Sequence, residues 1–210
     1  MARRNPLPPP PPPVHLRAWP DREAMLADRA QVLGELSRRS VGLRRLMLLW
    51  AMAVLVAVGW SFVGAALLTF AESLDVISYF FGALMLALGL ASMVPTGFAV
   101  AGAVRRDRQV RELLDQWGAL DRDPAADARC RAPGPTLCWL LLSVAPCALG
   151  LYVSFASTAG AEPGRDTYAG VAYGLGMGVI AWLTGLLGVA KAVSHYRWVT
   201  RTLMGAPVRR

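Results

Sequence analysis

Four long stretches without a charged side chain constrain what this chain can fold into. They cover residues 46–71, 76–104, 132–161 and 167–190 and are 26, 29, 30 and 24 residues long. A helix of about 20 apolar residues crosses a hydrocarbon layer ~30 Å thick, because each residue adds about 1.5 Å. Every stretch exceeds that length, and a soluble core has no need of four such stretches. The sequence therefore predicts an all-α, polytopic membrane protein built on a four-helix transmembrane bundle.

The uncharged stretches and their flanks divide the chain into segments. We expect spans at 46–70, 76–104, 136–157 and 168–195, with a cytoplasmic loop at 105–135. Pro95 and Pro146 fall inside the second and third spans, where proline removes a backbone hydrogen bond, so we expect kinks there. The flanking segments are a disordered basic, proline-rich tail at 1–19, an amphipathic cytoplasmic or interfacial helix at 20–45 and a cytoplasmic tail at 196–210.

The basic residues alternate from one side of the spans to the other. Of the 22 Lys and Arg residues, 21 fall in segments 1–45, 105–131 and 191–210. Short cytoplasmic loops retain such residues, so this positive-inside pattern predicts that both termini are cytoplasmic. It also predicts contact with the bilayer and with anionic lipid headgroups on that side. Nucleic acid is not an expected partner, because no basic motif with interleaved aromatic residues accompanies the charge.

Three cytoplasmic segments show the apolar spacing of an amphipathic helix. Residues recur three or four positions apart in the first segment, after the second span and after the fourth span. They are Leu26, Ala30, Leu33 and Leu36, then Val110, Leu113, Leu114 and Trp117, then Tyr196, Val199 and Leu203. We expect these segments to form helical extensions on the cytoplasmic side.

The tail contains six consecutive prolines, Pro8 to Pro13, which impose a polyproline II conformation. One interpretation is a docking peptide for an aromatic-lined groove. The other is a stiff spacer, which the absence of any further recognition feature favours.

Small residues recur at helical spacing within the spans, as they do where membrane helices pack closely. The fourth span carries Gly170, Gly174, Gly178, Ala181 and Gly185; the first carries Ala53, Ala57, Ser61 and Ala65; the second carries Ala83, Ala87 and Ala91. We interpret them as contact faces within one bundle. The alternative is that the glycine face of the fourth span joins two copies of the chain into a homo-oligomer.

The sequence offers little catalytic or metal-binding chemistry. The spans have no ionisable residue at mid-depth, and Lys191 is expected to reach the inner membrane edge. Asp107 and the later carboxylates of its segment alternate with arginines, which is typical of a solvated helix face. Cys138 and Cys147 are nine residues apart and too distant for a disulfide on one helix. We therefore expect no catalytic residue, metal or cofactor.

These observations favour a non-enzymatic integral membrane protein. We expect an accessory or scaffold subunit that engages cytosolic or membrane partners. The alternative is a channel or facilitator for a small neutral solute, formed by one copy or by an oligomer, since Pro95 and Pro146 free backbone groups within two spans. Arginine supplies 21 of the 22 basic residues. That bias, in an alanine-rich chain, indicates a bacterial protein and hence the inner membrane.

Overall fold

The computed structural model describes residues 7–16, 19–72, 75–121, 133–162 and 167–203. Within these ranges the chain is helical and contains no strand. The elements are η1 (Val14–Leu16), α1 (Arg22–Val41), α2 (Leu43–Glu72), α3 (Val76–Gly118), α5 (Pro133–Ala159), α6 (Tyr168–Trp198) and a final π-helical turn, η2 (Val199–Leu203). The expected fold class, all-α with four long apolar helices, is confirmed at that level.

Helices α2, α3, α5 and α6 are each long and apolar enough to cross a membrane. They contain 30, 43, 27 and 31 residues. The extra length of α3 comes from its amphipathic continuation, which follows the second span without a break to Gly118. The predicted extension after the second span is therefore part of the same rigid element as the span.

Side-chain caps explain where three of the helices begin. Asp21 accepts a hydrogen bond from the backbone of Ala24 at 2.7 Å, and Asp75 accepts one from Ser78 at 2.9 Å. Thr167 caps α6 in the same way, and such caps satisfy backbone donors that have no partner within the helix. Gly42 has an extended backbone and separates α1 from α2.

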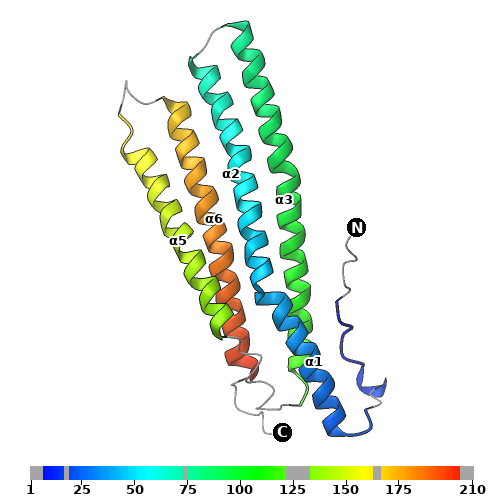
Figure 1. Cartoon of the computed structure of the whole chain (residues 1–210). Coiled ribbons are helices and arrows are strands. Elements are labelled where there is room, and N and C mark those ends of the chain that lie inside the picture. Colours follow the sequence, from blue (N-terminus) through cyan, green and yellow to red (C-terminus); the bar gives the residue numbers. More distant parts are fainter. Residues whose placement is uncertain (1–6, 17–18, 73–74, 122–132, 163–166, 204–210) are drawn as a thin grey trace.

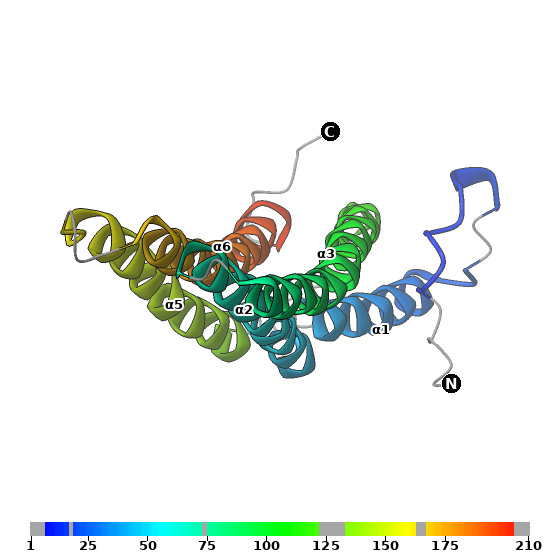
Figure 2. The same cartoon turned by 90° about the horizontal axis from the view of Figure 1, so that it is seen from above.

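The four long helices lie side by side in one layer, in the order α5, α6, α2, α3 (Figures 1 and 2). Helix α6 packs between α5 and α2, and α2 packs between α6 and α3. Helix α1 lies against the lower part of α3. The arrangement is thus more open than the closed bundle that we expected, because the outer helices α3 and α5 are separated by the inner pair.

Pro95 and Pro146 lie inside α3 and α5, and both helices continue past them. The kinks that we expected at these prolines therefore do not break either helix. A proline within a helix lacks one backbone donor, but the next turns supply their own hydrogen bonds and extend the helix.

The glycine stripe of α6 faces α5. A methyl group added at Gly178 would lie 2.6 Å from the backbone nitrogen of Ser154, and one at Gly185 would lie 2.5 Å from that of Cys147. Such distances are too short for a side chain, so the two backbones approach closely where glycine stands. Gly174 faces Ser157 in the same groove, whereas Gly170 meets only its own cap and Ala181 is half-buried.

The contact between α2 and α3 uses residues that the sequence analysis missed. Gly59 and Gly89 face each other, since a methyl group on Gly59 would lie 3.1 Å from the Gly89 carbonyl oxygen. The expected face through Ala83, Ala87 and Ala91 is wrong, because all three alanines are exposed. Alanine is apolar enough to face lipid, so its spacing alone does not identify the buried side.

The first-span stripe serves partly as a contact with α6. Ser61 lies with its hydroxyl 3.3 Å from the hydroxyl of Tyr173, and Trp60 donates to the Tyr173 carbonyl at 3.0 Å. Ala53 and Ala57 are half-buried, whereas Ala65 is exposed. The stripe therefore runs along the edge of the interface.

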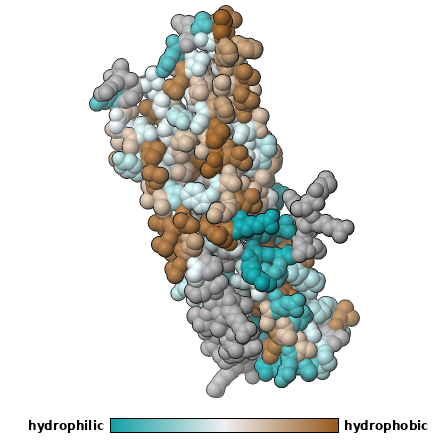
Figure 3. Space-filling model, in the orientation of Figure 1, coloured by the Kyte–Doolittle hydropathy of each residue, from teal (hydrophilic) through white to brown (hydrophobic). Residues whose placement is uncertain are grey.

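Large apolar side chains cover the upper part of the molecule, and hydrophilic residues collect toward its lower end (Figure 3). Exposed examples are Phe80, Phe98, Leu141, Tyr152 and Phe155. An apolar surface of this extent is typical of a membrane or protein interaction site.

Candidate functional site at the arginine-rich end

A hydrophobic core lies at the lower end of the four long helices, where α1, the end of α3 and the end of α6 meet (Figure 1). Its buried members come from three segments far apart in the sequence. They are Leu33, Leu36, Val110, Leu114, Trp117, Leu120 and Val199, and we call them the end core. The predicted stripes of the first segment and of the α3 extension thus pack against each other.

A buried arginine fastens α1 to the end of α3. Arg29 is only 1% exposed, and its Nε donates to the backbone oxygen of Trp117 at 3.2 Å. The last carbonyls of a helix lack partners within the helix and carry partial negative charge, so a guanidinium is stabilising there. Arg22 and Asp121 form an ion pair between the same two segments.

The proline run contacts an aromatic residue of the same chain. Trp117 Nε1 donates to the Pro9 carbonyl at 3.1 Å, and Leu7 and Trp19 pack against the end core. The described part of the tail therefore contacts the end core through Leu7 and Pro9. The expected disorder of the tail and its role as a stiff spacer stay predictions. Residues 1–6 and 17–18 of the tail lie outside the described part.

Asp107 of α3 forms ion pairs with two basic side chains from two other helices. Its Oδ2 lies 2.5 Å from Lys191 Nζ of α6, and its Oδ1 pairs with Arg45 of α2. The three side chains are only 19%, 14% and 25% exposed, in the order Asp107, Lys191, Arg45. We call this trio the ion-pair centre, and it joins the α2–α3 hairpin to the α5–α6 hairpin.

Apolar residues hold Lys191 in this position. Its ammonium lies 5.1 Å from the centre of the Trp139 ring, a distance at which the ring attracts a cation. Trp139 is itself buried with Leu46 and Ala192. The lysine thus extends between an aromatic face and a carboxylate.

The ion-pair centre corrects one expectation from the sequence: Asp107 is largely buried and paired, so it does not lie on a solvated face. Lys191 pairs with Asp107, and its expected reach to the inner membrane edge stays a prediction. The sequence contained a sign that Asp107 would be buried. Asp107 precedes Val110, Leu114 and Trp117 by three, seven and ten residues, which places it on the buried stripe of α3.

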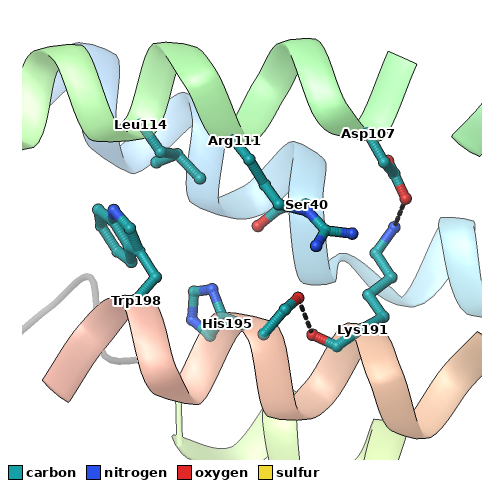
Figure 4. Close-up of a pocket in the computed structure, with 8 residues that line it drawn as sticks. Ser40, Asp107, Arg111, Leu114, Lys191, His195 and Trp198 are labelled. Atoms are coloured by element: carbon teal, nitrogen blue, oxygen red, sulfur yellow. Dashed lines mark hydrogen bonds and ion pairs between the residues drawn. The ribbon is translucent and has the colours of Figure 1, made fainter. Parts of the chain in front are cut away.

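A small pocket of about 30 Å³ adjoins the ion-pair centre between α1, α3 and α6 (Figure 4). Arg111 reaches into it from α3, Ser40 from α1, and Lys191 and His195 from α6. This volume accommodates about one or two water molecules. The pocket is therefore too small for a nucleotide or a drug-sized substrate, which need at least about 300 Å³.

Of the cysteines and histidines in the described ranges, only His195 lines this pocket. Cys147 lies against Gly185, and Cys138 packs beside Trp139. His15 is exposed in η1, whereas His195 is buried with its ring 5.8 Å from the Trp198 ring. Across the described ranges, no three His, Cys, Asp or Glu side chains come close enough together to hold a metal ion.

No protein-family model, curated protein or solved structure matches this chain. We call the end of the molecule formed by α1, the end of α3 and the end of α6 the arginine-rich end.

Proposed function

We propose that the protein is a non-enzymatic integral membrane subunit whose arginine-rich end lies in the cytoplasm and recruits or supports other proteins. The observation that carries this proposal is the end core. Two of its three segments are continuations of apolar helices, so the surface built on it is rigidly coupled to the layer of long helices. A scaffold needs such a fixed connection between a membrane anchor and a cytosolic surface.

The orientation follows from charge. Helix α1, the end of α3 and the end of α6 lie at the lower end of the molecule in Figure 1. In the sequence, 21 of the 22 basic residues belong to segments 1–45, 105–131 and 191–210, which contain these ends. Arginine-rich segments remain on the cytoplasmic side during insertion. In a bacterium, this pattern supports an inner-membrane location with both termini inside.

The open layer favours a scaffold over the channel alternative. A pore needs polar walls on all sides, and a single row of four helices cannot surround a path. The mild polar groups of the spans also bond within helices, as Thr96 does to the Ser92 carbonyl at 2.8 Å. A channel would require several copies of the chain.

Site-directed labelling tests the orientation. Single cysteines at positions 74, 164 and 108, in a chain without its native cysteines, are exposed to a membrane-impermeant maleimide in intact spheroplasts. We expect labelling at 74 and 164 only, and at 108 after the membrane is opened. Labelling at 108 in intact cells would contradict the proposal.

Photo-crosslinking tests the scaffold role. A photoreactive residue at Arg38 or Glu112, both exposed at the arginine-rich end, should capture a specific protein in native membranes. The same residue at Phe155, exposed at the opposite end of α5, is the control. Equal capture at all three positions would contradict the scaffold. Solute flux in proteoliposomes that is lost on Ser143→Val would instead support the channel.

A further inference from the structure

The pocket beside the ion-pair centre has more hydrogen-bond donors than acceptors. Its main acceptor is Asp107, whose two carboxylate oxygens already form ion pairs, one with Lys191 and the other with Arg45. The hydroxyl of Ser40 donates to the Ser37 carbonyl at 2.8 Å. The hydroxyl of Ser194 donates to the Lys191 carbonyl at 3.0 Å. The hydroxyl protons and the carboxylate are thus committed to contacts within the protein.

Several donors on the pocket wall remain available. The guanidinium of Arg111 reaches into the hollow in Figure 4, and the carboxylate that acts on it by charge, Asp115, lies four residues further along α3 and does not line the pocket. The indole Nε1 of Trp198 is buried and has no hydrogen-bond partner within the described residues. The ammonium of Lys191 has three N–H groups, and one of them donates a hydrogen bond to Asp107. A buried donor without a partner is costly, so this pocket favours a ligand rich in acceptors.

The local charge selects the sign of that ligand. Arg45 and Lys191 pair with Asp107, and Arg111 lies near the carboxylate of Asp115, so three cations are balanced by two carboxylates and one positive charge is in excess. Guanidinium and ammonium groups together are the usual partners of phosphate oxygens. One or two oxygens of a phosphate fit a volume of about 30 Å³, whereas the rest of the ligand must remain outside.

We propose that this pocket binds the phosphate group of an anionic phospholipid from the cytoplasmic leaflet. The inference rests on the proposed membrane orientation, which places the ends of the spans at the headgroup layer. Trp139 and Lys191 lie beside the pocket, and aromatic and basic residues are typical of that layer. A lipid supplies a phosphate at this depth while its chains stay against the apolar helices.

Lipid binding by the purified full-length chain tests the proposal. Native mass spectrometry from detergent micelles measures the dissociation constants of phosphatidylglycerol and phosphatidylcholine. Arg111→Gln should weaken phosphatidylglycerol binding about tenfold, because it removes a cation that lines the pocket and is not part of the ion pairs with Asp107. Arg108→Gln is the matched control: it removes the same charge one turn earlier on α3, from an exposed residue outside the pocket wall.

Trp198→Phe is a second variant. It keeps an aromatic ring packed against the end core and removes the indole N–H donor. It should weaken binding about threefold. Equal phosphatidylglycerol affinity in wild type, Arg111→Gln and Arg108→Gln would overturn the proposal, as would equal affinity for the two lipids.

Inorganic phosphate distinguishes the source of the anion. If millimolar phosphate binds in an Arg111-dependent manner while phosphatidylglycerol binding is insensitive to Arg111, the site serves a soluble anion and the lipid proposal is wrong. If phosphatidylglycerol binding depends on Arg111 and phosphate competes only weakly, the proposal is supported. These measurements use detergent solution, so they fail or succeed independently of the topology and crosslinking experiments above.

Discussion

Replacing Asp107 by Asn should be among the most damaging single changes at the arginine-rich end. The carboxylate is the shared partner of Lys191 and Arg45, which come from helices on opposite sides of the α2–α6 contact. Asparagine keeps the shape of the side chain but removes the charge. Two largely buried cations then face each other without the counter-charge that allows them to lie so close together.

The magnitude follows from the burial of the trio. Removing one partner from a fully buried ion pair costs about 3–5 kcal/mol, because it leaves an uncompensated charge. An exposed pair contributes about 0.2–1 kcal/mol. The three side chains are 14–25% exposed, nearer the buried case. We therefore expect Asp107→Asn to lower the free energy of unfolding by about 2–3 kcal/mol.

The assay is reversible unfolding in mixed micelles, in which a denaturing detergent is titrated against a mild one and tryptophan fluorescence is recorded. Glu112→Gln is the matched control, since it removes a carboxylate from an exposed position of the same helix. We expect the control to change the unfolding free energy by less than about 0.5 kcal/mol.

A double-mutant cycle separates this ion pair from general damage. Lys191→Met combined with Asp107→Asn should cost less than the sum of the two single changes, with a coupling of about 1–2 kcal/mol. The reasoning is refuted if Asp107→Asn behaves like Glu112→Gln, or if the two changes are additive.

Three further predictions concern packing, pH and the tail. Gly178→Leu should lower the unfolding free energy by about 1–3 kcal/mol in the same assay, since its side chain would enter the backbone of α5. Hydrogen bonds from Ser78 lower the pKa of the Asp75 carboxyl below its ordinary value of 3.8. This cap therefore stabilises α3 fully above pH 3.8, and the stabilisation is lost as the pH falls through the lower folded-state pKa. Amide exchange in the first turn of α3 should become faster at that low pH. Deleting residues 7–13 should speed hydrogen exchange around Trp117 severalfold, because its indole loses the Pro9 carbonyl.

Each of these predictions has a control in the same chain. Gly170→Leu adds the same side chain at an open position of α6 and should be nearly neutral; equal damage at both glycines would contradict the packing argument. Asp75→Asn keeps a capping oxygen without a titrating proton, so a persistent acid effect in this variant would assign the pH dependence to another group. Unchanged exchange after the deletion would show that the proline run is only a spacer.

Helix positions were predictable from the sequence because long uncharged, apolar stretches mark them. The expected spans at 46–70 and 168–195 correspond to α2 and α6, whose bounds are Leu43–Glu72 and Tyr168–Trp198. The differences arise where amphipathic segments continue a span without a change of helix. Hydropathy marks the end of the apolar part, and it carries no information about where the backbone stops being helical.

The arrangement of the helices was harder to predict, because small residues are compatible with both lipid and protein. Glycine was the better guide: Gly178 and Gly185 lie at the α5–α6 contact, and Gly59 and Gly89 lie at the α2–α3 contact. Alanines at similar spacing on α3 are exposed. Close backbone approach requires the absence of a side chain, whereas alanine adds little information beyond being apolar.

The two halves of the layer meet in one contact, between α2 and α6, and the ion-pair centre closes that junction at its lower end. Because α3 carries both Asp107 and the Val110–Trp117 part of the end core, any sliding of α3 along α2 would separate the carboxylate from Lys191 and shift the end core at the same time. Arg111 lies on the same helix, directly after Val110 and one turn after Asp107. A phosphate bound in this pocket, as proposed above, would contact both α3 and α6, so anionic lipid should stabilise the junction of the two hairpins.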